Sequence, residues 1–205
     1  MVKVGADWKT VSLTETFNDP VVVLKSVEGS GDPSKAADLK DFVTPRVKNV
    51  TGNSFEVMLQ STDASALSEE KNVPYIVVEA GRWKVNDFEI QAGHLEPKSF
   101  TSIFDGRPFG VEEFFPRFET EPVVITTIAS FNGSDPATTR NYKKSGFSLP
   151  VPGLVGLIGP IVFWRDDFRT GFETMIDEPS GGLFGSNVFE THVPERVDYL
   201  AVTPG

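Results

Sequence analysis

The chain has 205 residues and carries 19 Lys and Arg against 29 Asp and Glu, which gives a formal net charge of −10 at pH 7. This charge repels phosphate backbones, and no basic cluster is larger than Lys143-Lys144, so we expect no nucleic-acid partner. The absence of cysteine excludes disulfides, thiolate catalysis and Cys-ligated zinc.

The N-terminal residues predict strands and no secretory leader. Residues 1–7 lack the apolar core of a signal peptide, so we expect a protein made without a classical signal, including one released in a virus particle. Residues 8–17 alternate between apolar and polar side chains, which predicts a half-buried strand. Pro20 cannot donate a ladder hydrogen bond and therefore opens the next, fully apolar strand.

Residues 28–34 form a loop by composition, and three acids lie within or shortly after it. Asp32, Asp38 and Asp41 fit either a calcium site completed by backbone carbonyls or simple hydration, and the order Asp-x-Asp-x-Asp-Gly is missing. We therefore predict no metal site. Beyond the loop, two segments of period two flank Gly52-Asn53-Ser54 and predict a hairpin.

One strand pattern occurs twice in the chain. Residues 73–81 and residues 197–205 each contain a Tyr in an apolar run that ends in Gly, which indicates a strand buried on both faces in the middle of a sheet. Other segments recur in the same order, namely residues 17–24 with 118–126 and residues 46–59 with 140–149. Three matches in one order predict an internal duplication.

The region between the two copies is predicted to be structured. Asn86-Asp87 separates two short apolar segments and predicts a tight hairpin. The connection that follows contains Phe100, Phe104 and Phe109, which is too aromatic for a free linker. We therefore divide the chain into a first repeat (residues 1–82), a structured connection (83–110) and a second repeat (111–205).

The second repeat is expected to carry an insertion of roughly thirty residues, about 148–190, where the first repeat has a short loop. Its residues 149–164 are the most apolar run of the chain, and three prolines in the run exclude a membrane-spanning helix. Three roles fit the run: a contact with another subunit, a loop folded back over its own unit, or a tip that inserts into a membrane surface. We favour the subunit contact, with the predicted interface residues Leu154, Val155, Leu157, Ile158, Ile161, Phe163 and Trp164.

Catalytic motifs are missing from the sequence. His94 and His192 have no acid at metal-ligand spacing, and no nucleophile elbow, phosphate loop or dinucleotide fingerprint is present. The adjacent pairs Glu69-Glu70 and Glu112-Glu113 would point to opposite faces of a strand, which is wrong for a cooperating acid and base. We expect a non-enzymatic protein with no cofactor.

Two arginines occupy similar places in the two copies. Arg46 and Arg140 each precede a strand that contains Phe. A planar guanidinium held on a sheet suits either bidentate contact with sugar hydroxyls or carboxylates, or the bracing of a loop acid, and the sequence leaves both roles open. Asp32 is a third candidate for contact with a sugar.

The order of these elements resembles the H-type lectin domain of invertebrate agglutinins and discoidin-like proteins. The resemblance is carried by Pro20–Leu24, Arg46-Val47, Phe55 and residues 75–78. It implies a six-stranded antiparallel β-sandwich that assembles as trimers and binds N-acetylgalactosamine-type sugars in clefts between protomers. It also implies that Arg46 contacts the sugar, and Arg140 matches with a shorter spacing to the next Phe. The aromatic residues that stack on the sugar in the family are missing from residues 61–66.

We therefore expect an all-β protein of two tandem antiparallel β-sandwiches, H-type-lectin-like, with a loop insertion in the second. Two such units in each chain predict a homo-oligomer, most simply a trimer with six sandwiches around one axis. The expected role is a structural or adhesive component of a virion or another large extracellular assembly, in contact with other assembly proteins. The alternative is a stand-alone lectin that binds cell-surface glycans.

Overall fold

The computed structural model describes residues 1–24, 43–61, 67, 69–97, 110–134, 137–143, 148–149, 161–162, 168–177 and 194–203. In this part of the chain the protein is all-β, with antiparallel pairing between all strand neighbours and almost no helix. The expected fold class is confirmed at this level. We call residues 1–79 the first half and residues 81–203 the second half.

Seven of the described strands belong to the first half and form three small sheets, β1-β6, β2-β5-β4 and β3-β7. They are β1 (Val2–Val4), β2 (Lys9–Ser12), β3 (Pro20–Leu24), β4 (Val43–Thr51), β5 (Ser54–Ser61), β6 (Lys71–Val73) and β7 (Tyr75–Glu79). Alternate residues of these strands point inward, so Val22, Val47, Phe55 and Val73 meet in one fully buried core.

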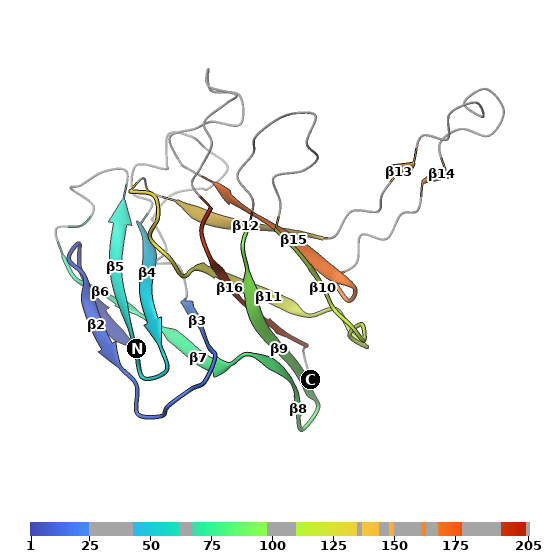
Figure 1. Cartoon of the computed structure of the whole chain (residues 1–205), viewed down its shortest axis with the longest axis horizontal. Helices are drawn as coiled ribbons and strands as arrows, with labels where there is room; N and C mark the ends of the chain where they lie inside the picture. The colour runs from blue at the N-terminus through green and yellow to red at the C-terminus, as the bar shows by residue number, and fades with distance from the viewer. Residues whose placement is uncertain are drawn as a thin grey trace, which may run out of the picture.

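The second half contains a three-stranded sheet β10-β15-β12, a four-stranded sheet β11-β16-β9-β8 and the pair β13-β14. Its strands are β8 (Gly81–Val85), β9 (Phe88–Leu95), β10 (Gly110–Glu113), β11 (Val123–Ile128), β12 (Thr138–Lys143), β13 (Ser148–Leu149), β14 (Ile161–Val162), β15 (Gly171–Asp177) and β16 (Val197–Val202). Phe114, Phe118, Phe172, Val197 and Tyr199 are buried in its core. Figure 1 shows β13 and β14 lying apart from the other sheets.

The strand pairs of the two halves share one register. In β3-β7 Leu24 lies opposite Tyr75, and in β11-β16 Thr126 lies opposite Tyr199. The sheets β2-β5-β4 and β10-β15-β12 also share a feature of their register. Arg46 lies opposite Met58 in the first, and Arg140 lies opposite Met175 in the second.

An aromatic pair also recurs in the two cores. The rings of Phe55 and Tyr75 meet at 5.3 Å with an interplanar angle of 73°, and those of Phe172 and Tyr199 meet at 5.2 Å and 66°. Both pairs have the edge-to-face geometry that aromatic rings prefer. Tyr75 and Tyr199 therefore each pack edge-on against a Phe, whereas only Tyr199 also contacts Phe114 and forms hydrogen bonds with Glu112 and Gln91 among the contacts described.

The repeated strand is buried in the middle of a sheet in only one of its two copies. β16 lies between β11 and β9 and is almost fully buried, as expected. The expectation was wrong for β7, which pairs with β3 alone among the described strands and stays partly exposed. The reason is the hairpin β8-β9, which pairs with β16 and gives the second half two further strands. The predicted turn of this hairpin at Asn86-Asp87 is confirmed.

The match of residues 46–59 with 140–149 placed the partner strand of β12 near Phe147. This was wrong, because the strand that pairs with β12 begins at Gly171. Phe147 itself lies outside the described residues, and Ser148–Leu149 pairs with Ile161–Val162 instead. β15 therefore interrupts the predicted insertion, about 148–190, and is the central strand of a sheet. The sequence signal was present, because residues 171–175 read Gly-Phe-Glu-Thr-Met where residues 54–58 read Ser-Phe-Glu-Val-Met.

A small apolar cluster joins the two halves. Val21 and Val23 on β3 pack with Ala92 on β9 and Leu200 on β16, and all four are buried. These side chains are on the face of β3 opposite to Val22 and Leu24, which fill the core of the first half. β3 is therefore covered on both faces, and it positions the polar residues described next.

Candidate functional site

A fully buried ion pair connects the halves. Arg46 on β4 and Glu195, just before β16, both have side chains with 0% exposure, and Arg46 Nη2 lies 2.9 Å from Glu195 Oε1. Arg46 Nη1 also donates to Gln60 Oε1 at 3.0 Å, and the guanidinium lies over the ring of Phe131 at 4.9 Å. A charge that is removed from water in this way has to be paired and hydrogen-bonded.

Glu195 organises the loop that follows β11. Its carboxylate accepts hydrogen bonds from the backbone N–H groups of Asn132 and Gly133 at 3.0 Å and from the hydroxyl of Ser130. Gln60 Nε2 donates to Ser134 O at 2.6 Å, so a strand of the first half also holds this loop. The loop belongs to the second half but is fixed on the sheet β2-β5-β4 of the first.

The predicted sugar contacts have different outcomes. For Arg46 the geometry supports the second role considered, the bracing of a loop acid, because its guanidinium is buried against Glu195. Arg140 lies on β12 opposite Met175, and its contact with a sugar stays a prediction. Asp32 lies outside the described residues. So do all the predicted interface residues except Ile161, which lies on β14 opposite Leu149.

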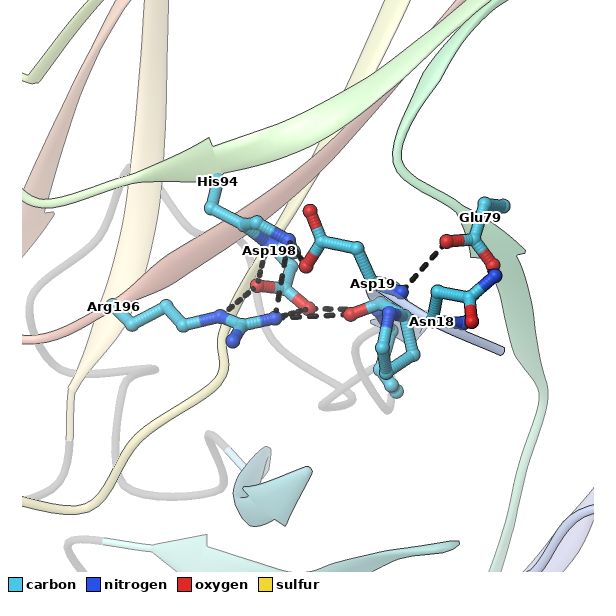
Figure 2. A network of polar contacts seen from close by, with 8 residues as sticks. Asn18, Asp19, Glu79, His94, Arg196 and Asp198 are labelled. Carbon is cyan, nitrogen blue, oxygen red and sulfur yellow. Dashed lines mark hydrogen bonds and ion pairs between the residues drawn. The ribbon is translucent and has the colours of Figure 1, made fainter. Parts of the chain in front are cut away.

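A second polar cluster surrounds His94 on β9 (Figure 2). His94 Nδ1 lies 2.8 Å from Oδ1 of the buried Asp198, and His94 Nε2 lies 2.9 Å from Oδ1 of Asp19. Asp19 precedes β3 in the first half, whereas His94 and Asp198 belong to the second. Because each ring nitrogen faces a carboxylate, the protonated imidazolium satisfies both contacts and bridges the halves.

Arg196 completes this cluster from the second half. Its Nε donates to Asp198 Oδ1 at 2.7 Å, and its Nη2 donates to Pro20 O at 2.9 Å. Asp198 Oδ2 accepts from the backbone N–H of Val22 at 2.7 Å. Asp19 is held from its own side, because its backbone N–H and that of Asn18 donate to Glu79 (Figure 2).

The hydrogen bond with Asp198 raises the pKa of His94 above its ordinary value of 6.5. Burial and the nearby Arg196 act in the opposite direction, and the contact with Asp19 supports the rise. A buried Asp behind a His is also the arrangement that orients a general base. Here the outer nitrogen of His94 faces the carboxylate of Asp19, so the His94–Asp198 pair links the second half to the first.

A third polar cluster, inside the second half, surrounds the hydroxyl of Tyr199. Its hydroxyl donates to Glu112 Oε1 at 2.8 Å, and Gln91 Nε2 donates to the same hydroxyl at 3.0 Å. Burial raises the pKa of Glu112, and burial likewise raises the pKa of Tyr199. Arg82 donates to Gln91 and lies over the ring of Phe118 at 4.3 Å. The cluster fixes β10 against β9 and β16.

A cleft of about 520 Å³ lies between the halves. The first half lines it with residues of β3, β4 and β7, and the second half with residues of β11 and β12. The lining residues are Val23, Leu24, Thr44, Pro45, Pro74, Tyr75, Ile76, Val124, Ile125, Thr126, Thr127, Ile128, Thr139 and Asn141. None of these residues carries a formal charge, although the chain is strongly acidic.

No protein-family model matches the chain, and no solved structure matches it. The chain is similar to halomucin of Haloquadratum walsbyi, with 30% identity over 149 residues. The similar region is 70% of this chain but 2% of halomucin, so the chain spans a very small part of that relative.

Sequence reasoning missed the partners of the buried charges. Asp198 stands in an apolar strand at the position where the first copy has Pro74, and this exchange was the available signal. Glu195 gave no signal, because an acid beside a strand is usually hydrated. Within the described ranges, no group of three or more His, Asp and Glu side chains is placed to hold a metal ion. No described helix is long and apolar enough to span a bilayer.

Proposed function

We propose that the two halves are copies of one antiparallel β-sandwich of the H-type-lectin kind, fused in tandem. The support is the common register of β3-β7 and β11-β16, together with the equivalent places of Arg46 and Arg140 opposite a Met. The matching Phe–Tyr pairs add core packing to the backbone pairing. The hairpin β8-β9 is then an addition to the second copy.

The function that follows is a non-enzymatic structural or adhesive module of a large extracellular assembly, such as a virion. The observation that carries this proposal is the locked junction, in which buried charges of each half are satisfied by the other. A rigid pair of sandwiches suits a structural part, because it holds neighbouring proteins in a fixed position and transmits mechanical load between them. The similarity to a small part of halomucin fits a module that occurs within much larger proteins.

The module would form a homo-oligomer, most simply a trimer, through the apolar run of residues 149–164. Leu149 of β13 and both residues of β14 belong to this run, and the two strands lie apart from the other sheets (Figure 1). An apolar run of this length is stabilised by burial against another surface.

The test is light scattering coupled to size exclusion of the purified chain. A variant in which residues 150–160 are replaced by a Gly-Ser linker of equal length should be a monomer with an unchanged circular dichroism spectrum. The same replacement of residues 28–34 is the matched control and should leave the oligomer intact. A monomeric wild-type chain, or an oligomer that survives the loss of residues 150–160, contradicts the proposed assembly.

The alternative of a stand-alone glycan-binding lectin no longer has the support of an exposed Arg46. It now depends on Arg140 and Asp32, whose contacts with a sugar stay predictions. A glycan array with the wild-type chain and Arg140→Ala separates the two functions: binding that is lost in the variant favours the lectin, and the absence of binding favours the structural module.

A further inference from the structure

The two halves differ in what covers the outer edge of one strand. In an antiparallel pair, every second residue turns its backbone groups away from the partner strand. On β3 these outward groups form hydrogen bonds with residues of the second half. Pro20 O accepts from Arg196, and the N–H groups of Val22 and Leu24 donate to Asp198 Oδ2 and Thr127 Oγ1 at 2.7 and 2.9 Å.

β11 has the same register as β3, and no described strand pairs with its outer edge. Val124 and Thr126 are partly exposed on this edge, whereas Ile128 is only 3% exposed. The backbone N–H of Ala129 donates to Arg196 O, and this bond fixes the outward residues as Val124, Thr126 and Ile128. Among the described residues no group accepts from these three N–H groups. The carbonyls of Val124 and Thr126 receive only long contacts, 3.5 Å each, from Asn141 Nδ2 and Thr139 Oγ1.

This open edge faces the cleft between the halves. Ile125 on β11 and Ile76 on β7 are 38% and 48% exposed and both line the cleft, so apolar side chains flank the free backbone groups. Thr126, Thr139 and Asn141 add hydroxyl and amide groups along the same wall. The lining has no charge that would pair with an acidic or basic ligand.

We propose that the outer edge of β11 is a strand-addition site for an extended, uncharged segment of a partner protein. The segment pairs with the outward groups of Val124 and Thr126, and its alternate apolar side chains pack against Ile76 and Ile125. An open edge is a template for pairing, and proteins that leave one uncovered usually have a partner for it or protect it with charges. This inference goes beyond the assembly role proposed above and does not depend on it.

The probe is a panel of capped synthetic peptides of the length of β11, in which Thr or Asn alternates with Val, Ile or Tyr. The full-length chain is titrated to millimolar peptide while amide chemical shifts and hydrogen exchange are recorded by NMR. The amides of Val124 and Thr126 should shift and become protected. Peptides of the same composition with a central Pro should bind at least tenfold more weakly, because Pro removes a donor.

Three variants make the test specific. Thr126→Pro removes one outward N–H and should abolish binding, whereas Thr126→Val keeps the N–H and should bind normally. Lys84→Pro makes the same change at an outward position of β8, the other edge of this sheet, and should also bind normally.

The proposal is overturned if no peptide of the panel binds, if peptides bind without protecting the amides of β11, or if Thr126→Pro binds as well as Lys84→Pro. Methyl glycosides of neutral sugars are titrated in parallel. Occupation of the cleft by a glycoside, with no effect of any peptide, also overturns strand addition and favours the lectin alternative.

Discussion

Arg46 shows how a charged residue can belong to the core. It is fully buried, and every partner assigned to it comes from an adjacent strand or from the second half. A buried ion pair is weak evidence for stability, because desolvation opposes the attraction, but a single remaining charge is strongly unfavourable. Arg46 and Glu195 therefore make the correct docking of the halves a condition for folding.

Replacing Arg46 alone should destabilise the protein. In Arg46→Met the carboxylate of Glu195 stays buried without its cation, and we expect a loss of about 3 kcal/mol or more in the free energy of unfolding by urea denaturation. The double variant Arg46→Met with Glu195→Gln should recover most of this loss, because a neutral amide still accepts from Asn132 and Gly133. A loss below about 1 kcal/mol in the single variant, within the range of an exposed pair, would contradict the buried bridge.

His94 predicts a pH dependence of stability. Its pKa is raised in the folded protein, so its stabilising contribution is fully present below the ordinary value of 6.5 and is lost as pH rises through the folded value. Denaturation curves across this interval should show a fall in stability with rising pH. His94→Gln should remove that fall and His192→Gln should keep it. An equal slope of unfolding free energy against pH in wild type and His94→Gln would show that the contacts of His94 with Asp19 and Asp198 are not the cause.

The backbone conformation at Gly171, the first residue of β15, requires glycine. Its φ of 149° disfavours L side chains, and a Cβ there would lie 2.2 Å from the carbonyl oxygen of Glu112. Gly171→Ala should cost about 2 kcal/mol or more, because the clash is with backbone of the neighbouring strand β10. Gly5→Ala is the matched control, since its Cβ would meet only the flexible side chain of Glu70 at 3.4 Å. Equal unfolding free energies of the two variants would refute this.

The strand content and the hairpins could be predicted because they depend on local pattern. The turns at Gly52-Asn53 and Asn86-Asp87 join strands that are neighbours in sequence, so composition alone indicates them. The partner of β12 was missed, because a long connection separates it from β15 and Phe147 offered a nearer match than residues 171–175. Likewise, the unequal burial of β7 and β16 depends on where β8-β9 docks, which no local pattern reports.

At the scale of the whole molecule, the candidate site is formed where the two halves meet. The sequence paired Arg46 with Arg140, and in the structure each lies opposite a Met, but the sequence could not show that Arg46 meets Glu195. Contacts of this kind join residues that are far apart in the chain. The proposed binding edge has the same origin, because the second half bonds the outward N–H groups of β3, whereas no described residue bonds those of β11.

The locked junction predicts that the halves unfold together. Native-state hydrogen exchange should give one opening free energy for buried amides of β5 and of β16, and Arg46→Met should lower both by the same amount. Two separate opening energies, with only one of them sensitive to the substitution, would mean that the halves are independent domains.

The most direct test of the duplicated sandwich is a NOESY spectrum of the aromatic-labelled full-length protein. Two equivalent cores predict ring-to-ring cross-peaks between Phe55 and Tyr75 and between Phe172 and Tyr199, with similar intensities. If either cross-peak is missing, or if Tyr199 instead contacts Phe147, the halves are not copies of one sandwich.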